Sequence, residues 1–229
     1  MDIINIPEPQ LRPVSRSEGT LQQQVYSELR RSLMVGAFIP GQAVTLRSLA
    51  RRLGTSPMPI REAINRLIAE RALEMLPNRS VVVPRMTREK FVELSMLREK
   101  FEGMAAEAAG RRVTPALVKR LTKLNDEFLA SIAKRDVPRI LEGNQQFHFA
   151  LYEASGYVLL VPMIESLWLQ AGPFMYVSLS AADTLWDATH HKVAIEALAA
   201  GDAVATRKAI EKDVRTTARS LLQSIDFQG

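Results

Sequence analysis

Apolar residues recur at helical spacing through the first third of the chain. From residue 21 onward, one apolar side chain per turn falls on the same helix face: Leu21, Val25, Leu29 and Leu33. This helix should end at Gly36, because glycine readily adopts the left-handed conformation that terminates helices. A second, short helix over residues 46–53 is predicted by apolar residues on one side of it, and Gly54 should end it.

A third helix and a hairpin follow. Ser56 is expected to cap a helix over residues 57–71, which has Pro59 in its first turn, where proline is tolerated. Beyond it, residues 72–76 and the β-branched run 81–83 flank a polar turn, a pattern typical of two short paired strands. Helix, short helix, turn, helix and hairpin in this order are typical of a winged helix-turn-helix.

The rest of the chain has helical patterns from the cap residue Thr87 onward. The predicted helices lie near residues 88–110, from 114–115 onward, 136–155, 158–171, 184–200 and 202–224, with a short one after Pro173. Because strands and helices do not alternate, we expect an antiparallel helical bundle. The fold class is therefore mainly α, with an N-terminal winged helix-turn-helix and a C-terminal all-α bundle.

These patterns divide the chain into four parts. Residues 1–19 lack periodicity and are interpreted as a flexible arm. Residues 20–84 form the winged helix-turn-helix and residues 85–88 a linker. Residues 89–229 form the helical domain.

Composition narrows the possible function classes. A chain of 229 residues with 47% hydrophobic content can bury the cores of two small domains. No apolar stretch is long enough to span a membrane and residues 1–13 do not resemble a signal peptide, so we expect a cytoplasmic protein without a membrane partner. The absence of cysteine excludes disulfides, thiolate metal sites and cysteine nucleophiles.

The positive charge is concentrated in the front of the chain. Residues 1–90 hold 14 Lys and Arg against 8 Asp and Glu, whereas residues 91–229 hold 16 against 17. Thirteen of those first fourteen are arginines, which suit bidentate contacts with phosphate and guanine. The front segment is therefore a candidate nucleic-acid surface, with a solvated basic surface as the alternative.

Residues 49–63, LARRLGTSPMPIREA, resemble the helix-turn-helix signature of the GntR family of transcription regulators. The helical half resembles FCD, the effector domain of the family's fatty-acid-regulator branch. That likeness rests on Arg98 with Glu102, on residues 144–156 and on residues 191–202. The resemblance covers roughly residues 20–222 and implies a ligand-responsive, sequence-specific DNA-binding regulator.

The expected DNA-binding residues lie on the third helix, at the start of the second helix and at the wing tip: Arg47, Ser56, Met58, Pro59, Arg61, Asn65 and Arg79. The resemblance places Arg47 and Arg61 on family positions that contact DNA, and Ser56 is a candidate phosphate contact. The exposed leading face of the third helix should reach base edges in the major groove. Many family members have Arg where this chain has Pro57 and Gly where it has Ser80, so base preference and the wing's approach should differ.

Each of the three arginines also has a structural interpretation. Arg61 could form a salt bridge with Glu62 or Glu70 on a solvated helix, and the same kind of role is open to Arg47. Arg79 could be an ordinary turn residue.

The resemblance also implies a divalent metal, which FCD domains commonly hold with one Asp and three His. The matching positions here are Asn144, His148, His191 and Asp213. Two ligand types have changed, yet the set keeps one negative charge, and two imidazoles with two oxygens suit zinc, nickel or manganese. Histidines satisfied within the core are the alternative, and His190 is expected near the site or at the surface.

Arg98 matches a family arginine that faces the bundle cavity, so it is the candidate anchor for a small carboxylate effector. An ion pair with Glu102, four residues later on the same helix, is the alternative. The large apolar residues of this half are assigned to the core: Phe147, Phe149, Met163, Trp168, Phe174 and Met175.

The sequence thus predicts a ligand-responsive transcription regulator that binds double-stranded operator DNA as a homodimer, as repressor or activator, and is not an enzyme. A helical-bundle metallohydrolase is the alternative, although no HExxH motif and no placed general base are evident. A third possibility is a non-specific nucleic-acid or scaffold protein, whose affinity would depend steeply on salt.

Overall fold

The computed structural model describes residues 11–14, 19–181, 188–225 and 227. The chain forms two compact units, residues 1–86 with 169–176 and residues 87–168 with 177–229. The first unit thus includes a piece of helix that the sequence pattern assigned to the helical domain. Each unit is described by itself below.

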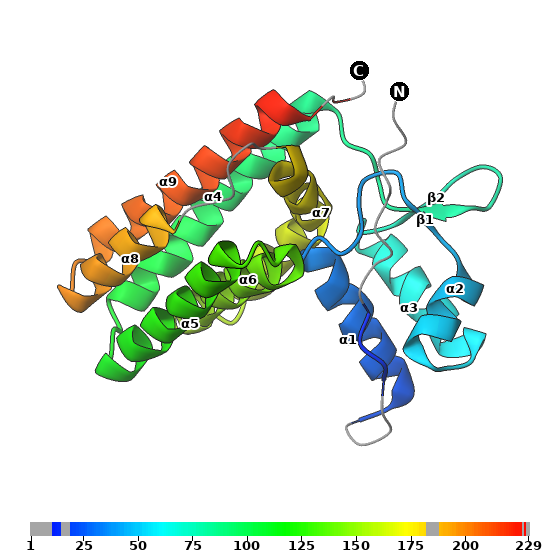
Figure 1. Ribbon diagram of the computed structural model, residues 1–229, viewed down its shortest axis with the longest axis horizontal. Coiled ribbons are helices and arrows are strands. Elements are labelled where there is room, and N and C mark those ends of the chain that lie inside the picture. Colours follow the sequence, from blue (N-terminus) through cyan, green and yellow to red (C-terminus); the bar gives the residue numbers. More distant parts are fainter. Residues whose placement is uncertain (1–10, 15–18, 182–187, 226, 228–229) are drawn as a thin grey trace. The chain divides into compact units, whose positions relative to one another are not determined.

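In its described residues the N-terminal unit contains three complete helices, the segment 169–176 of a fourth and a small sheet (Figure 1). Its elements are α1 (Leu21–Met34), β1 (Ala43–Val44), α2 (Leu46–Leu53), α3 (Pro57–Ala69), β2 (Glu74–Met75) and β3 (Val81–Val82). The sheet is antiparallel in the order β1-β3-β2, with Val81 opposite Val44 on one side and Met75 on the other. The predicted helices and hairpin are confirmed, and β1 is an additional strand.

Local capping explains where these helices start and stop. The side chains of Thr20 and Gln23 form a capping box at the start of α1. Thr45 accepts a hydrogen bond from the amide of Ser48 at the start of α2, and Gly54 ends that helix with a left-handed φ of 66°. The core between the helices is formed by the predicted apolar residues: Val25, Leu29, Leu33, Leu49, Leu53, Ile60, Ile64 and Leu67.

Two further segments lie against this core. The backbone amide of Arg12 donates to Glu28 Oε1 over 2.8 Å, and that of Val14 donates to the carbonyl of Leu53 over 3.3 Å. Residues 11–14 are therefore bound to the unit, unlike the flexible arm expected over residues 1–19, of which the rest up to residue 18 lies outside the described residues. Gly172 lies directly on the last turn of α1, because a Cβ added to it would stand 2.2 Å from the carbonyl oxygen of Leu33.

The helical unit is built from the other described helices (Figure 1), except for residues 169–176 of α7. They are α4 (Arg88–Gly110), α5 (Pro115–Ala133), α6 (Val137–Glu153), α7 (Leu160–Ala181), α8 (Thr189–Ala199) and α9 (Ala203–Ser224). The caps predicted at Thr87 and Thr114 accept hydrogen bonds from the amides of Lys90 and Leu117. Pro173 lies inside α7, so the predicted break at this proline is wrong, while residues 182–187 lie outside the described residues.

The long helices α4 and α9 run side by side (Figure 1), and α8 lies against α9. Small residues permit the close approach, since a Cβ added to Gly110 would stand 2.7 Å from the Cα of Ala203. Helix α5 is packed on α6 and α8, and α6 also contacts α4. This arrangement brings one side chain each from α6, α8 and α9 to the same point. None of the described helices is both long and apolar enough to cross a membrane.

Candidate metal centre and nucleic-acid interface

Three predicted metal ligands meet inside the helical unit. His148 on α6, His191 on α8 and Asp213 on α9 offer ligand atoms that all lie within 4.8 Å of one another. The Nε2 atoms of His148 and His191 are 3.2 Å apart, and His148 Nε2 lies 3.2 Å from Asp213 Oδ2. Both imidazoles are buried, with 2% of each residue exposed.

The carboxyl group of Asp213 is ionised at neutral pH. Burial alone would raise its pKa, but contact with the ring of His148, whose Nε2 donates to the carboxylate whenever it carries a proton, and the nearby ring of His191 lower the pKa to about 2. The site therefore presents one full negative charge beside two imidazoles.

A hydrogen-bonded chain fixes the tautomer of His148. Its Nδ1 lies 2.8 Å from the hydroxyl of Tyr152, which in turn donates to Glu102 Oε2. Burial raises the pKa of Tyr152 well above its ordinary value, and the Glu102 charge raises it further, so the hydroxyl keeps its proton. Because that proton goes to Glu102, Tyr152 accepts the Nδ1 proton of His148. In the neutral form of His148 the lone pair is then on Nε2, directed at His191 and Asp213, where a cation can take the place of a proton.

Arg98 completes this chain at its other end. Its Nε donates to Glu102 Oε1 over 2.7 Å, and its guanidinium carbon lies 4.7 Å from the ring centre of Trp168. The ion pair with Glu102 that the sequence left as the alternative is thus present, and it links Arg98 to the histidine site. The Trp168 ring centre is 5.6 Å from that of His148, so this predicted core residue also borders the site.

The ring of His191 is held by aromatic neighbours. The Phe147 ring is stacked on it at 3.9 Å with an interplanar angle of 16°, and Phe128 lies 5.0 Å away. Asn144 precedes His148 by one turn of α6 and is half-buried, so its role as a fourth ligand stays a prediction. His190 Nε2 lies 3.3 Å from the hydroxyl of Thr216, outside the three-residue cluster.

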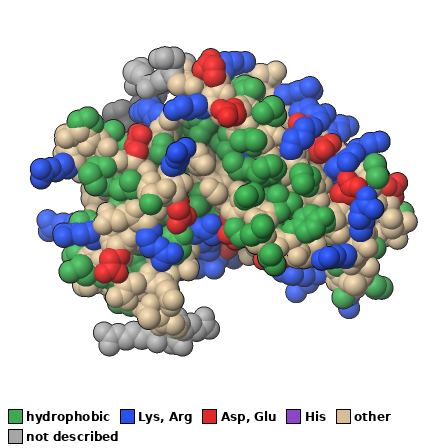
Figure 2. All heavy atoms as spheres, turned by 180° about the vertical axis from the view of Figure 1, so that it is seen from behind, with side chains coloured by type: hydrophobic (Ala, Val, Ile, Leu, Met, Phe, Trp, Pro, Cys, Tyr) green, Lys and Arg blue, Asp and Glu red, His purple; other side chains and the backbone are tan. Residues whose placement is uncertain are grey.

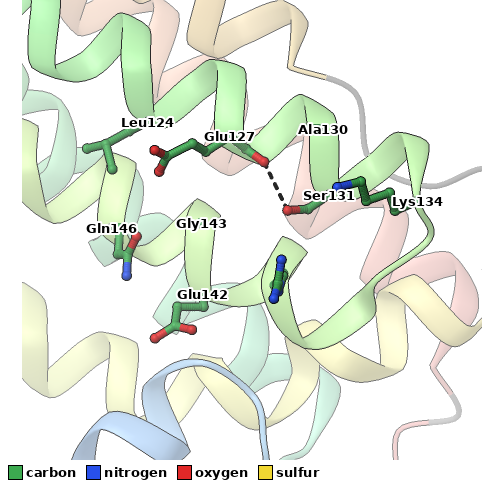
Figure 3. A pocket seen from close by; sticks show the side chains of 9 residues that line it. Leu124, Glu127, Ala130, Ser131, Lys134, Glu142, Gly143 and Gln146 are labelled. Atoms are coloured by element: carbon green, nitrogen blue, oxygen red, sulfur yellow. Dashed lines mark hydrogen bonds between the residues drawn. The ribbon is translucent and has the colours of Figure 1, made fainter.

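A separate cavity opens between α5 and α6 (Figure 3). Its volume is about 370 Å³, and charged residues line it, including Glu127, Lys134 and Glu142. Its floor includes Gly143 and the buried Ser131, whose hydroxyl donates to the carbonyl of Glu127. None of the predicted ligands contributes to this cavity, so it is distinct from the histidine site.

In the N-terminal unit, α3 presents three of the predicted DNA-binding residues on one exposed face, Met58, Arg61 and Asn65. The structure describes no ion pair between Arg61 and Glu62 or Glu70. Pro59 is buried, so its predicted place on the exposed face of this helix is wrong. It lies four residues before Ala63 on the apolar side of the helix.

The other predicted contacts lie near α3 in the chain and are exposed. Arg47 is in the first turn of α2, and Ser56 precedes α3 without a side-chain capping bond. Because the first turn of α3 contains Pro57 and Pro59, it has fewer amide donors for a phosphate than an ordinary helix start. Arg79 sits at the tip of the hairpin with a positive φ of 66°.

The sequence matches two family descriptions. Residues 21–83 match "Bacterial regulatory proteins, gntR family" and residues 93–216 match the FCD domain. The HTH-type transcriptional regulator McbR of Escherichia coli (strain K12) is 31% identical over 186 residues, 80% of this chain and 84% of that protein. The gluconate operon transcriptional repressor of Bacillus licheniformis is 27% identical over 160 residues, 67% of this chain and 65% of that protein.

Solved structures agree with this assignment. That of E. coli McbR/YncC has a TM-score of 0.83 at 29% identity and covers 90% of this chain and 99% of its own. A putative GntR regulator from Rhodococcus sp. RHA1 has a TM-score of 0.71 at 23% identity, with coverage of 90% and 99%, and supports the fold alone. These relatives are regulators and not enzymes, so the metallohydrolase alternative has no support. The chain belongs to the GntR family of DNA-binding transcription regulators and carries an FCD domain.

Proposed function

We propose that this chain is a ligand-responsive transcription regulator in which His148, His191 and Asp213 hold a divalent metal ion and a small carboxylate binds beside it. The observation that carries the proposal is the convergence of His148 Nε2, His191 Nε2 and the Asp213 carboxylate, with the Tyr152 hydroxyl placed to hold the His148 proton on Nδ1. A buried pair of imidazole nitrogens and an ionised carboxylate so close together are well suited to a cation.

The spacing of the donor atoms suits a transition metal. Bonds of about 2.0–2.1 Å in tetrahedral geometry place neighbouring ligand atoms about 3.3 Å apart. The two separations from His148 Nε2 are both 3.2 Å. Zinc, nickel and manganese all accept such nitrogen and oxygen donors, and Asn144, water or the effector would complete the coordination.

Two neighbouring groups favour an anionic effector. The Arg98 guanidinium uses Nε for Glu102, which leaves its terminal nitrogens as donors for a carboxylate. The indole nitrogen of Trp168 is buried and has no hydrogen-bond partner among the described residues. A buried donor without an acceptor is costly, and an effector carboxylate would relieve that cost.

The exposed face of α3 is proposed to read operator DNA in the major groove, with Arg47, Ser56 and Arg79 as additional contacts. A homodimer would read two half-sites of a palindrome. Apolar side chains exposed on the helical unit would suit contact with a second copy: Val92, Met96, Met104, Val158, Leu159 and Met163. Figure 2 shows apolar side chains gathered on a face of the helical unit.

Repression is the proposed mode of action, following the gluconate operon regulator of Bacillus licheniformis, a relative named as a repressor. The effector would then act by binding one of two states of the protein more tightly and so changing operator affinity.

Metal analysis of the purified protein tests the proposal. The double variant His148→Ala, His191→Ala should contain no bound metal, while His190→Ala, a matched histidine outside the cluster, should retain it. Operator affinity should then respond to small carboxylates in the wild type and not in the double variant. Equal metal content in the wild type and the double variant would show that these residues do not bind the metal.

A further inference from the structure

A side chain from α1 contacts the C-terminal end of α3. Tyr26 donates its hydroxyl proton to Glu70 Oε1, and Glu70 is the C-cap residue of α3. The guanidinium carbon of Arg66 lies 3.6 Å above the centre of the Tyr26 ring. One tyrosine thus contacts two residues of the same helix, one turn apart, by two different interactions.

A second residue of α1 also contacts Glu70. Arg30, one turn after Tyr26, places Nε 3.5 Å from Glu70 Oε2, so both carboxylate oxygens of Glu70 face α1. Burial raises the pKa of Tyr26, and the hydrogen bond to Glu70 raises it further. The phenol therefore stays protonated and keeps donating at neutral pH. We call these four residues, Tyr26, Arg30, Arg66 and Glu70, the α1–α3 clasp.

The clasp lies at the C-terminal end of α3, whereas the residues proposed to contact bases begin at its N-terminal end. Met58, Arg61 and Asn65 occupy the exposed face that begins in the first turn, whereas Arg66 and Glu70 lie in the last turn and at the cap. The apolar packing of Ile60, Ile64 and Leu67 beneath α3 is non-directional, whereas hydrogen bonds have a preferred geometry. The clasp supplies those directional contacts.

A small rotation would matter for base recognition. Side-chain tips lie about 5–6 Å from the axis of a helix, so a roll of about 15° moves them by about 1.5 Å. Hydrogen bonds to base edges need donor and acceptor within about 2.7–3.2 Å, so that shift is enough to break a bidentate contact. Contacts with phosphates from flexible side chains tolerate it better.

We propose that Tyr26 is a positioning residue for DNA sequence discrimination, which sets the roll of α3 through Arg66 and Glu70. The inference rests on the proposed recognition of bases by the exposed face of α3. It predicts that damage to the clasp weakens binding to the operator and leaves binding to unrelated duplex nearly unchanged.

The test uses the full chain and an operator selected by the wild-type protein from a random duplex library. Anisotropy titrations at fixed salt then compare that duplex with a scrambled one. Tyr26→Leu removes the ring and the hydroxyl, Tyr26→Phe removes the hydroxyl alone, and Ser27→Ala is the exposed neighbour on α1 that serves as control. We expect the ratio of specific to non-specific affinity to fall about tenfold in Tyr26→Leu, less in Tyr26→Phe, and not at all in the control.

Two further measurements separate positioning from general damage. Partial unfolding lowers affinity for both duplexes equally, whereas a misplaced α3 lowers the ratio and flattens the base preference when the selection is repeated with the variant. Tyr26→Leu combined with Arg66→Ala should cost no more than the larger single effect, because both act through one contact. If Tyr26→Phe and Glu70→Gln are both folded and both keep the wild-type ratio of specific to non-specific affinity, the proposal is overturned. If the wild-type protein selects no sequence from the library, base recognition by α3 itself is overturned.

Discussion

His148 donates its Nδ1 proton to the hydroxyl of Tyr152, 2.8 Å away and one turn later on the same helix. Tyr152 passes its own proton toward Glu102, whose second oxygen is paired with Arg98. The His148 lone pair that would face the proposed metal thus depends on residues that would not themselves touch it. Such outer partners of a ligating histidine fix the ring and its tautomer.

Tyr152→Phe should therefore weaken metal binding by about 10–100-fold while the protein stays folded. The phenyl ring fills the same buried space, but Nδ1 loses its acceptor and both tautomers of His148 become accessible. Competition with a chromophoric chelator measures the affinity. Tyr157→Phe, which alters an exposed tyrosine, is the matched control, and an affinity in Tyr152→Phe equal to that of this control would contradict the tautomer argument.

Periodicity alone could not assemble this site. The spacing of four between His148 and Tyr152, and between Arg98 and Glu102, places each pair on one helix face. Which helices meet depends on tertiary packing, and Glu102 is 50 positions from Tyr152. The resemblance supplied His148, His191 and Asp213, whereas Tyr152 was missed because its role appears only once α4 lies beside α6.

Arg61→Ala should abolish discrimination between operator and unrelated DNA and cost about 1–3 kcal/mol or more of operator binding free energy. Arg61 is exposed on α3, and the structure describes no ion pair that would hold it against its own domain. A titration at fixed salt with both duplexes checks this. Arg120→Ala, which removes the same charge from the exposed surface of α5, should leave the affinity ratio unaltered. Operator affinity equal in the two variants would withdraw the assignment of Arg61.

The DNA-binding unit followed its sequence patterns more closely than the helical unit did. Most of the apolar residues of α1, α2 and α3 are buried where the periodicity placed them, although Leu21 is only half-buried, because three amphipathic helices can cover one core in few ways. Pro59 was misplaced, although its spacing of four from Ala63 already puts it on the buried face. The two-residue strand β1 has no pattern of its own and exists by pairing with β3.

Glu99 joins α4 to α9 through two hydrogen bonds from Arg215, of 2.7 and 3.0 Å. Those bonds hold the pKa of Glu99 below its ordinary value of 4.5. Because the folded-state pKa is the lower one, the stabilisation is present above pH 4.5 and is lost as the pH falls through the folded-state value. Glu99→Gln should thus lower the free energy of unfolding by about 1 kcal/mol at neutral pH, since Arg215 is partly exposed and solvent weakens the pair.

Denaturant titrations at neutral and acidic pH check this, because the difference between wild type and Glu99→Gln should shrink as the acid protonates Glu99. Glu153→Gln is the control, since Glu153 and Arg120 are both exposed and 3.8 Å apart. A difference for Glu99→Gln that is the same at both pH values would show that the ion pair is not its cause.

Gly172 and Gly143 both lie inside helices, where alanine is ordinarily favoured over glycine by about 0.5–1 kcal/mol. At Gly143 the added Cβ would meet Phe128 at 3.5 Å, an ordinary contact, so Gly143→Ala should be neutral or stabilising. At Gly172 the added Cβ would stand 2.2 Å from the carbonyl oxygen of Leu33 and 2.6 Å from that of Met34, both backbone atoms. Gly172→Ala should therefore destabilise the N-terminal unit by about 1–3 kcal/mol, because the end of α1 must shift to make room. Thermal unfolding of the two variants checks the opposite signs, and a Gly172→Ala protein as stable as Gly143→Ala would show that α7 does not rest on α1 in this way.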